Sequence, residues 1–144
     1  MGRFYFRLEP VLKCRTVKEE QEVQALAQAQ RDKEKLEETL RIAAEEYGES
    51  LEQNGETLWE LEQWAVYRDL LRRRVKMRIA ELQEAVAEVD RCRAALLSAR
   101  QDRLVVEKVK ERRYAIFQAE EAGKERRHYD ELSQLAFQNR IRHK

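Results

Sequence analysis

The stretch SLEQNGETLWE, residues 50–60, interrupts an otherwise uniform run of helix-forming residues. Asn54 and Gly55 predict the end of a helix, because both tolerate the left-handed conformation that commonly closes one. Thr57 and Glu60 then have the spacing of a capping box, in which each side chain accepts a hydrogen bond from the other residue's backbone N–H. A helix end followed at once by a helix start predicts a tight turn between two antiparallel helices.

The composition supports long helices. Charged residues make up 40% of the 144 residues, and the chain contains one proline and four glycines, which is typical of coiled coils rather than of a globular core. The 29 basic and 28 acidic side chains nearly balance, and this argues against a dedicated nucleic-acid-binding protein. No apolar run approaches the roughly 20 residues that span a bilayer, and we expect no secretory signal.

The first helix is expected over residues 9–53, because Pro10 is favoured in a first helical turn. Its apolar residues recur at spacings typical of an amphipathic helix. They are Leu8, Val11, Leu12, Leu26, Leu36, Leu40, Tyr47 and Leu51. Between Leu12 and Leu36 the stripe is filled only by Val23, Ala25, Ala27 and Ala29, which bury little area.

The second helix is expected over residues 58–140, with Gly123 as a point where it would bend or loosen. Its apolar seam alternates steps of three and four, as in a coiled coil, with Arg93 as the one poor fit. The seam residues are Leu58, Leu61, Ala65, Val75, Ile79, Leu82, Val86, Val89 and Leu96.

Folding back at Gly55 has consequences for the pairing of the helices. It would place Tyr47 near Trp64, Leu40 near Leu71, Leu26 near Val86 and Leu12 near Ala99. About 35 residues after Leu104 would then have no partner within the hairpin, a length of roughly 50 Å. The sequence therefore predicts an all-α fold: one long, rod-shaped antiparallel two-helix coiled-coil hairpin with its turn at 54–57 and a projecting C-terminal part.

Enzymatic activity is not expected, and neither is a cofactor or a metal. His128 and His143 lack a metal-ligand spacing, and no phosphate-binding loop or zinc-protease motif occurs. A two-helix rod also offers no cavity that would exclude water from a reaction. Cys14 and Cys92 form no disulfide framework, and we expect both to be buried helical residues in a reducing cytoplasm.

Two local features have more than one interpretation. Residues 68–78 contain six basic residues and one acidic residue. They either pair with acidic residues of the first helix or form a docking patch for an acidic protein surface or anionic lipid. Four aromatic residues near the turn either staple it or serve as exposed interaction anchors. They are Tyr47, Trp59, Trp64 and Tyr67.

The N-terminal sequence FYFRLEPVLKCR, residues 4–15, followed by Glu19 and Glu20, resembles the opening F-x-F-R-L-E-x-V-L-x-x-R of the FliJ family. The aromatic residues around the turn resemble that family's hairpin region, and residues 129–132, YDEL, resemble its C-terminal element. The resemblance covers most of the chain. It implies a small cytoplasmic, non-enzymatic protein of the bacterial flagellar type III export apparatus, similar in fold to the central stalk of rotary ATPases.

The resemblance also implies partners: the hexameric export ATPase, the export-gate membrane protein and, further, export chaperones. It places the chain peripherally, at the cytoplasmic side of the membrane at the flagellar base. The implied gate-binding patch is Leu36, Leu40, Tyr47, Trp64, Tyr67 and Leu70. The implied contact with the ATPase ring is Phe4, Phe6, Arg7, Leu8, Arg15, Asp130, Glu131 and Leu132. Ala43, Arg74, Met77 and Glu81 depart from the residue types expected in the gate patch.

Two other functions remain open from the sequence. The apolar residues after Leu104 are also compatible with a scaffold that self-associates through a coiled coil. The stalk of a virulence-type secretion system would share the architecture, although it usually lacks this N-terminal motif.

Overall fold

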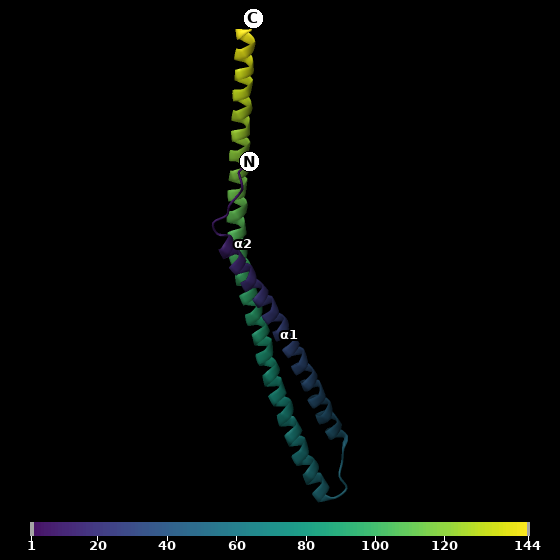
Figure 1. Ribbon diagram of the computed structural model, residues 1–144. Coiled ribbons are helices and arrows are strands. Elements are labelled where there is room, and N and C mark those ends of the chain that lie inside the picture. The colour runs from purple at the N-terminus through teal and green to yellow at the C-terminus, as the bar shows by residue number, and fades with distance from the viewer. Residues whose placement is uncertain (1, 144) are drawn as a thin grey trace. The chain divides into compact units, whose positions relative to one another are not determined.

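The computed structural model describes residues 2–143 and contains two helices, α1 from Glu9 to Glu52 and α2 from Leu58 to Arg142 (Figure 1). The two helices pack against each other, and no strand occurs in the described residues, so the expected all-α fold is confirmed. The chain divides into two compact units. We call residues 18–100 the hairpin unit, and the residues up to Val17 together with those from Gln101 onward the terminal unit.

In the hairpin unit, α1 ends through a contact with α2 rather than through a left-handed residue. No described glycine or other residue has a positive φ, so the left-handed cap expected at Asn54 and Gly55 is wrong. Instead, the Arg68 side chain reaches across from α2. Its Nε donates to the Ser50 carbonyl at 2.8 Å, and its Nη2 donates to the Gln53 carbonyl. The carbonyls at a helix end lack the full set of helical hydrogen bonds. Arg68 supplements the long bond that the Ser50 carbonyl accepts from the Gln53 N–H, at 3.4 Å, and supplies a donor to the Gln53 carbonyl.

The start of α2 has the predicted capping box. The Glu60 N–H donates to Thr57 Oγ1 at 3.2 Å, and the Glu60 carboxylate accepts from the N–H groups of Thr57 at 3.4 Å and Glu56 at 2.7 Å. Gly55 packs directly on this first turn. A Cβ at Gly55 would lie 2.5 Å from the Cβ of Glu60 and 3.0 Å from the Leu61 nitrogen. Gly55 is therefore required by close approach and not by its backbone angles.

The helices of the hairpin unit pair in a different register from the one expected. Arg74 contacts Glu46 at 3.3 Å, Arg100 contacts Glu19 at 3.2 Å, and Ala29 clusters with Val89 and Cys92. The expected neighbours are therefore displaced by roughly two helical turns. The reason is visible in Figure 1, where the first turns of α2 begin beyond the last turn of α1.

The side of α2 that faces α1 also differs from the expectation. Val75, Leu82, Val89 and Leu96 do lie in the seam. The seam positions between them, however, are occupied by Arg78, Ala85 and Cys92 of the same helix. Ile79 and Val86, which were expected at the seam, are 41% and 39% exposed. The heptad position that the sequence pattern had assigned to Arg93 is therefore filled by the buried Cys92, and Arg93 is exposed. Leu58, Leu61 and Ala65 are likewise exposed, so the α2 seam begins only at Trp64.

The two cysteines differ in their surroundings. Cys92 is buried, and its thiol lies 3.6 Å from Glu88 Oε1. Burial raises the pKa of the Cys92 thiol, and the Glu88 carboxylate raises it further. Cys14 is exposed, so the expectation that both cysteines are buried is wrong for this residue.

We predict that replacing Gly55 by Ala destabilises the hairpin by about 1–3 kcal/mol, because the added methyl group collides with the backbone of the α2 start. Gly48→Ala is the matched control. Its Cβ would meet nothing within 4 Å, so it should stabilise the helix by about 0.5–1 kcal/mol. Urea unfolding followed by circular dichroism measures both changes. Equal effects of the two substitutions would contradict the close approach at Gly55.

We predict that iodoacetamide alkylates Cys14 at least about tenfold faster than Cys92 in the folded chain, because the thiolate is the reactive species and Cys92 is buried with a raised pKa. Mass spectrometry of peptides released by a glutamate-specific protease measures the two rates, because this cleavage leaves Cys14 and Cys92 in different peptides, whereas trypsin would release the same Cys-Arg dipeptide from both sites. In guanidinium chloride the difference should vanish. Rates that already agree in buffer would show that Cys92 is accessible in the folded chain.

Candidate binding surfaces

In the terminal unit, the residues before α1 form a short segment that lies along α2. We call residues 2–8 the N-terminal strap. Phe6 anchors it, because this side chain is only 5% exposed. Its ring lies 5.9 Å from Lys110 Nζ and 5.9 Å from Arg113 Cζ, within the range of cation–π attraction. The neighbouring Tyr5 points away from α2 and is 83% exposed.

Phe4 forms the second anchor of the strap, in an aromatic cluster with α2. Its ring centroid lies 5.2 Å from that of Tyr114, in an edge-to-face arrangement, and 5.5 Å from that of Phe117. Aromatic pairs at such distances contribute about 0.5–1.5 kcal/mol beyond the area they bury. The alternation of Phe4 and Phe6 in the F-x-F motif therefore places two rings on α2 and one residue outward.

Polar contacts fix both ends of the strap. The Gly2 N–H donates to Glu121 Oε2 at 3.2 Å, and Lys110 Nζ lies 2.7 Å from Glu9 Oε2. The pKa of Glu121 is lowered, first by the hydrogen bond from Lys124 and then by the one from Gly2. Because the folded pKa is depressed, this contribution is present above the ordinary carboxyl pKa and is lost as the pH falls through the lowered value.

The strap corrects the expectation that α2 has no partner after Leu104. Arg15 donates to the Asp102 carbonyl at 2.8 Å, and the strap then covers α2 as far as Glu121. The exposed part of α2 begins beyond this contact, and residues 124–143 are exposed throughout. Gly123 does not interrupt α2.

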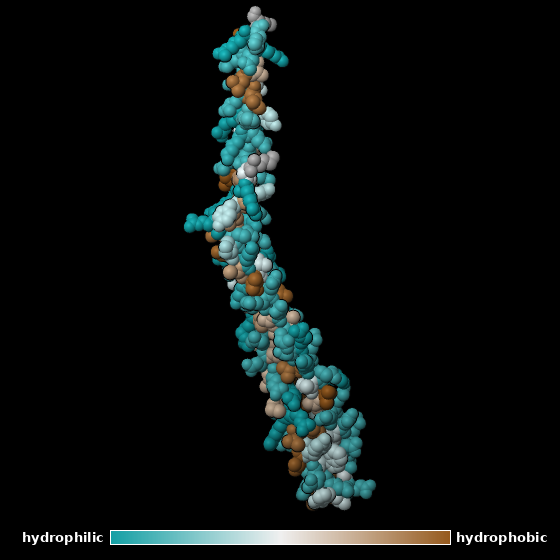
Figure 2. Space-filling model, viewed as in Figure 1, coloured by the Kyte–Doolittle hydropathy of each residue, from teal (hydrophilic) through white to brown (hydrophobic). Residues whose placement is uncertain are grey.

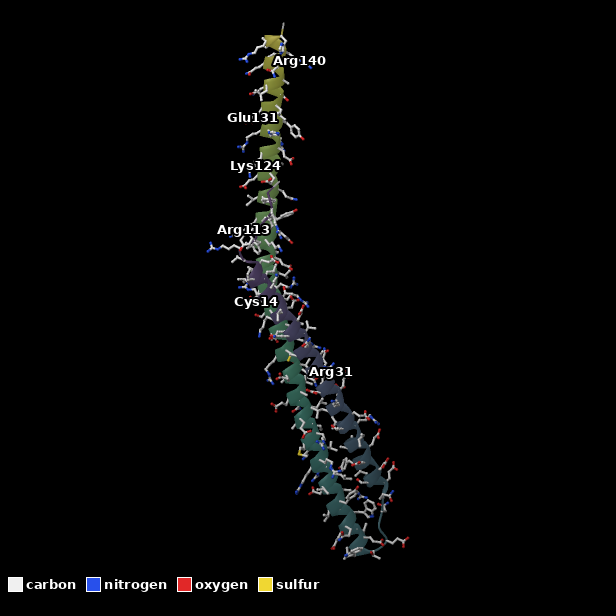
Figure 3. The ribbon with its side chains drawn as sticks, in the orientation of Figure 1. Cys14, Arg31, Arg113, Lys124, Glu131 and Arg140 are labelled. Carbon is white, nitrogen blue, oxygen red and sulfur yellow. The ribbon has the colours of Figure 1, made fainter. Side chains whose placement is uncertain are left out.

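The residues expected at the ATPase ring therefore fall into two groups. Phe4, Phe6 and Leu8 are buried or half-buried, and Arg15 is held by its bond to α2. Of the five N-terminal residues in the predicted contact, Arg7 is therefore the exposed one. Asp130, Glu131 and Leu132 all lie on the exposed end of α2. Figure 3 shows Glu131 and Arg140 projecting from this single helix.

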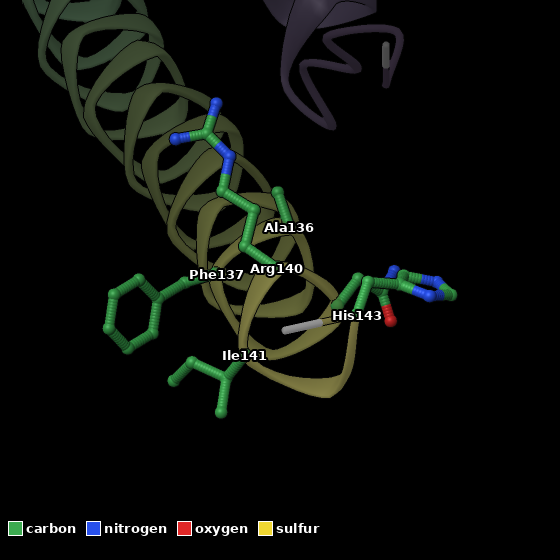
Figure 4. Close-up of a pocket in the computed structure, with 6 residues that line it drawn as sticks. Ala136, Phe137, Arg140, Ile141 and His143 are labelled. Carbon is green, nitrogen blue, oxygen red and sulfur yellow. The ribbon is translucent and has the colours of Figure 1, made fainter.

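The last turns of α2 carry large apolar side chains in contact with solvent, among them Leu132, Leu135, Phe137 and Ile141. A shallow hollow is lined by six residues between positions 136 and 143, among them Phe137, Arg140 and Ile141. Figure 4 shows these side chains spread around one helix, so α2 alone forms the hollow. Such a surface can pack against another protein but does not enclose a small molecule.

The residues expected at the export gate lie in the hairpin unit, and most of them serve the fold. Leu36, Leu40 and Tyr47 are half-buried in the α1 seam. Trp64 and Tyr67 contact each other edge to face, with ring centroids 5.8 Å apart. Leu70 and Tyr67 are the exposed members, at 53% and 46%. Figure 2 shows the apolar side chains of the visible face as small patches among hydrophilic ones.

The basic stretch of residues 68–78 is only partly neutralised by α1. Arg74 pairs with Glu46 of α1 at 3.3 Å. Arg72 and Arg73 instead pair with Asp69 of their own helix, at 2.7 and 3.0 Å, and their side chains remain 55% and 77% exposed. Pairing across the hairpin is therefore realised at Arg74, and positive charge stays available at the surface of α2.

A family model for the flagellar FliJ protein matches residues 4–142, nearly the whole chain. The chain belongs to the FliJ family. Membership implies a structural, non-catalytic protein of the flagellar export apparatus. No curated protein and no solved structure matched the chain.

The FliJ chain has no feature of a metal site or a membrane span within its described part. No group of three potential metal-ligating side chains occurs among residues 2–143. Over the same residues, neither helix has a segment long and apolar enough to cross a bilayer.

The sequence did not predict the α2 residues that hold the N-terminal strap, namely Lys110, Tyr114 and Glu121. The aromatic pair Tyr114 and Phe117, three residues apart on one helix face, is the signal that could have indicated it.

We predict that Phe6→Ala releases the N-terminal strap and lowers the free energy of unfolding by about 3 kcal/mol, since a buried ring is lost. Hydrogen exchange of the Glu9 amide, which donates to the Phe6 carbonyl at 3.1 Å, should accelerate. Tyr5→Ala is the matched control, because this exposed neighbour should change stability by less than about 0.5 kcal/mol. Unchanged exchange in the Phe6 variant would mean that the strap is held without this ring.

Proposed function

We propose that this FliJ protein is a non-enzymatic stalk and adaptor of the flagellar type III export apparatus, binding the export ATPase hexamer through the terminal unit and the export gate through the hairpin unit. The main support is the exposed end of α2. It presents Leu132, Leu135, Phe137 and Ile141 to solvent beside the carboxylates of Asp130 and Glu131. Apolar patches of this kind on a monomer mark protein contacts.

A stalk role requires binding without chemistry. A single chain inside a ring of like subunits contacts them unequally, and it can bias their conformations only by binding one state better than another. The exposed end of α2 carries large apolar anchors and charges of both signs, which favour selective protein contacts over one permanent interface. The gate contact and any binding of export chaperones belong to the same proposal.

The proposal predicts that removing residues 125–144 abolishes binding to the export ATPase, because the truncation deletes the exposed end of α2. The strap contacts end at Glu121, so both packed units should remain folded. The measurement is affinity for the ATPase hexamer, with circular dichroism as the check of folding. Undiminished affinity of the folded truncated chain would overturn the ATPase contact.

A charge reversal tests the same surface without shortening the chain. Asp130→Lys with Glu131→Lys should weaken ATPase binding about tenfold or more, a typical cost for central interface residues. The matched control is Glu20→Lys with Glu34→Lys, which changes the net charge equally on exposed positions of α1. Equal losses in both variants would indicate a general charge effect.

Self-association is the second candidate, favoured by the same exposed side chains of the α2 end. Analytical ultracentrifugation of the full chain at micromolar concentration separates the two functions. A stable oligomer that is lost when residues 125–144 are removed would favour a scaffold.

A further inference from the structure

The face of α2 that the N-terminal strap covers is repeated in kind beyond the end of the strap. The strap contacts α2 at four positions spaced by four, three and four residues, which we call the strap site. They are Lys110, Tyr114, Phe117 and Glu121. The counterparts 18 residues farther along the chain, which we call the repeat site, are His128, Leu132, Leu135 and Asn139. Because 18 residues make about five complete helical turns, both sites lie on the same face of α2, roughly 27 Å apart.

The two sites offer comparable chemistry. In each, two large apolar or aromatic side chains one turn apart lie between two polar ones. At the strap site the Glu121 carboxylate accepts the N–H of Gly2 at 3.2 Å, and the side-chain carbonyl of Asn139 is an acceptor at the matching place of the repeat site. Lys110 lies over the Phe6 ring, and His128 offers a planar ring or, when protonated, a cation in the equivalent position.

The repeat site is open to solvent. Leu132 and Leu135 are 48% and 56% exposed, and His128 and Asn139 are exposed as well. The repeat site therefore continues an interface that is already formed five turns earlier on the same helix.

The strap shows how this face of α2 is covered. Gly2, Phe4 and Phe6 contact α2 at successively earlier positions, so the strap runs antiparallel to the helix. Alternate residues of an extended chain lie about 6.6 Å apart. Three or four residues of a helix rise by about 4.5–6 Å. Alternate side chains of an extended segment therefore keep pace with successive turns of this face.

A helical partner fits the repeat site less well. A coiled-coil seam needs apolar residues that continue in steps of three and four over several turns. At the repeat site only Leu132 and Leu135 are apolar, because His128 and Asn139 occupy the next positions on either side. Two apolar side chains about 4.5 Å apart along the helix axis can be covered by a single ring, as Phe4 does at the strap site.

The chain's own strap cannot reach the repeat site. Helix α1 begins at Glu9, whose carboxylate is held 2.7 Å from Lys110. About 33 Å of helix separates Lys110 from Leu132. The chain between Phe4 and Glu9 spans at most about 18 Å. A second copy would first have to release its own strap from the same contacts, so the occupant belongs to a different protein.

Charge adds a requirement for this occupant. At the strap site the guanidinium of Arg113 lies 5.9 Å from the Phe6 ring, whereas its counterpart 18 residues farther on is Glu131. Asp130 precedes Glu131, and residues 128–139 contain no lysine or arginine. A basic side chain next to the second apolar residue of the segment would complement these carboxylates. The strap itself has this pattern, since Arg7 follows Phe6.

We propose that the repeat site binds an extended segment of a partner protein, with large apolar side chains at alternate positions followed by a basic residue. The segment runs antiparallel to α2, with its first apolar side chain over Leu132 and Leu135 and its second beside His128. The inference rests on the proposed function in so far as that function places a protein contact on the α2 end. It adds the conformation and the chemistry of the segment that is bound there.

The first test uses a synthetic peptide with the sequence of residues 2–9, GRFYFRLE, as the probe for the full chain. A photoreactive benzoylphenylalanine replaces its first phenylalanine. Trypsin then releases residues 114–124 and 128–140 of the chain in separate peptides, which mass spectrometry distinguishes. We expect the cross-link within residues 128–140. A cross-link confined to residues 114–124 would mean that the probe displaces the strap, and it would overturn the inference.

The second test measures the affinity of the fluorescent probe by anisotropy, with circular dichroism as the check of folding. Leu132→Gln with Leu135→Gln should weaken binding about tenfold or more. The matched control is Phe137→Gln with Ile141→Gln, which should bind normally. It removes comparably exposed apolar side chains from the same helix end, about 150° or more away from the repeat site.

The spacing of the two rings in the probe tests the extended conformation. The peptide GRFYRFLE has the same composition, but its phenylalanines are three residues apart, which is close to one helical turn. We expect it to bind more weakly than GRFYFRLE. Tighter binding of GRFYRFLE would indicate a helical occupant and would contradict the inference.

The outcomes separate this inference from the proposed function. If the wild-type chain shows no saturable binding of the probe up to about 1 mM, the inference fails, whereas the ATPase contact is decided by the truncation and charge-reversal experiments. A cross-link within residues 128–140 together with undiminished ATPase binding by the truncated chain would support the repeat site and overturn the ATPase contact. A dimer of the full chain that Leu132→Gln with Leu135→Gln removes would make a second copy the occupant and count against the inference.

Discussion

The contact of Arg68 with the last carbonyls of α1 fixes the geometry of the hairpin unit. One guanidinium group closes α1 at Ser50 and Gln53 and ties its end to a point three turns inside α2. Because a charged donor on α2 serves both carbonyls, a slip of one helix along the other would break these bonds. The close approach of Gly55 to Glu60 holds the other side of the turn. Together they set the register of the helices in this unit.

The seam of the hairpin unit is polar for a coiled coil, and this explains why the register needs such anchors. Small or polar side chains occupy many of its steps, among them Ala29, Ala43 and Ser50, while Leu71 is the one large side chain that is fully buried. Glu19 and Glu22 sit at the α1 seam and use Arg100 and Lys18 as partners. Little apolar area therefore distinguishes one register from the next, and directional polar contacts do so instead.

Because the two helices bury few large side chains between them, many large apolar side chains remain exposed and available for binding. In the terminal unit the strap takes Tyr114 and Phe117 into the fold and leaves the end of α2 exposed. In the hairpin unit, α1 covers one face of α2, while large apolar side chains elsewhere on α2, such as Trp59 and Val66, stay exposed. A protein that works by contact rather than by chemistry needs such faces, and both lie on α2. The family motif at residues 4–9 acts as a structural element that determines where the exposed surface begins.

What the sequence determined by itself was local. The capping box of Thr57 and Glu60 and the helical character of both segments follow from residues three or four positions apart, and the N-terminal motif indicated the family. The tertiary structure decided the rest. The C-cap comes from Arg68, far along the chain, and α2 faces α1 with Arg78, Ala85 and Cys92 although Ile79 and Val86 are more apolar. Two overlapping heptads on one helix are indistinguishable by periodicity alone. Only the position of the partner, set by contacts between distant residues, decides which of them is buried and which remains free to bind.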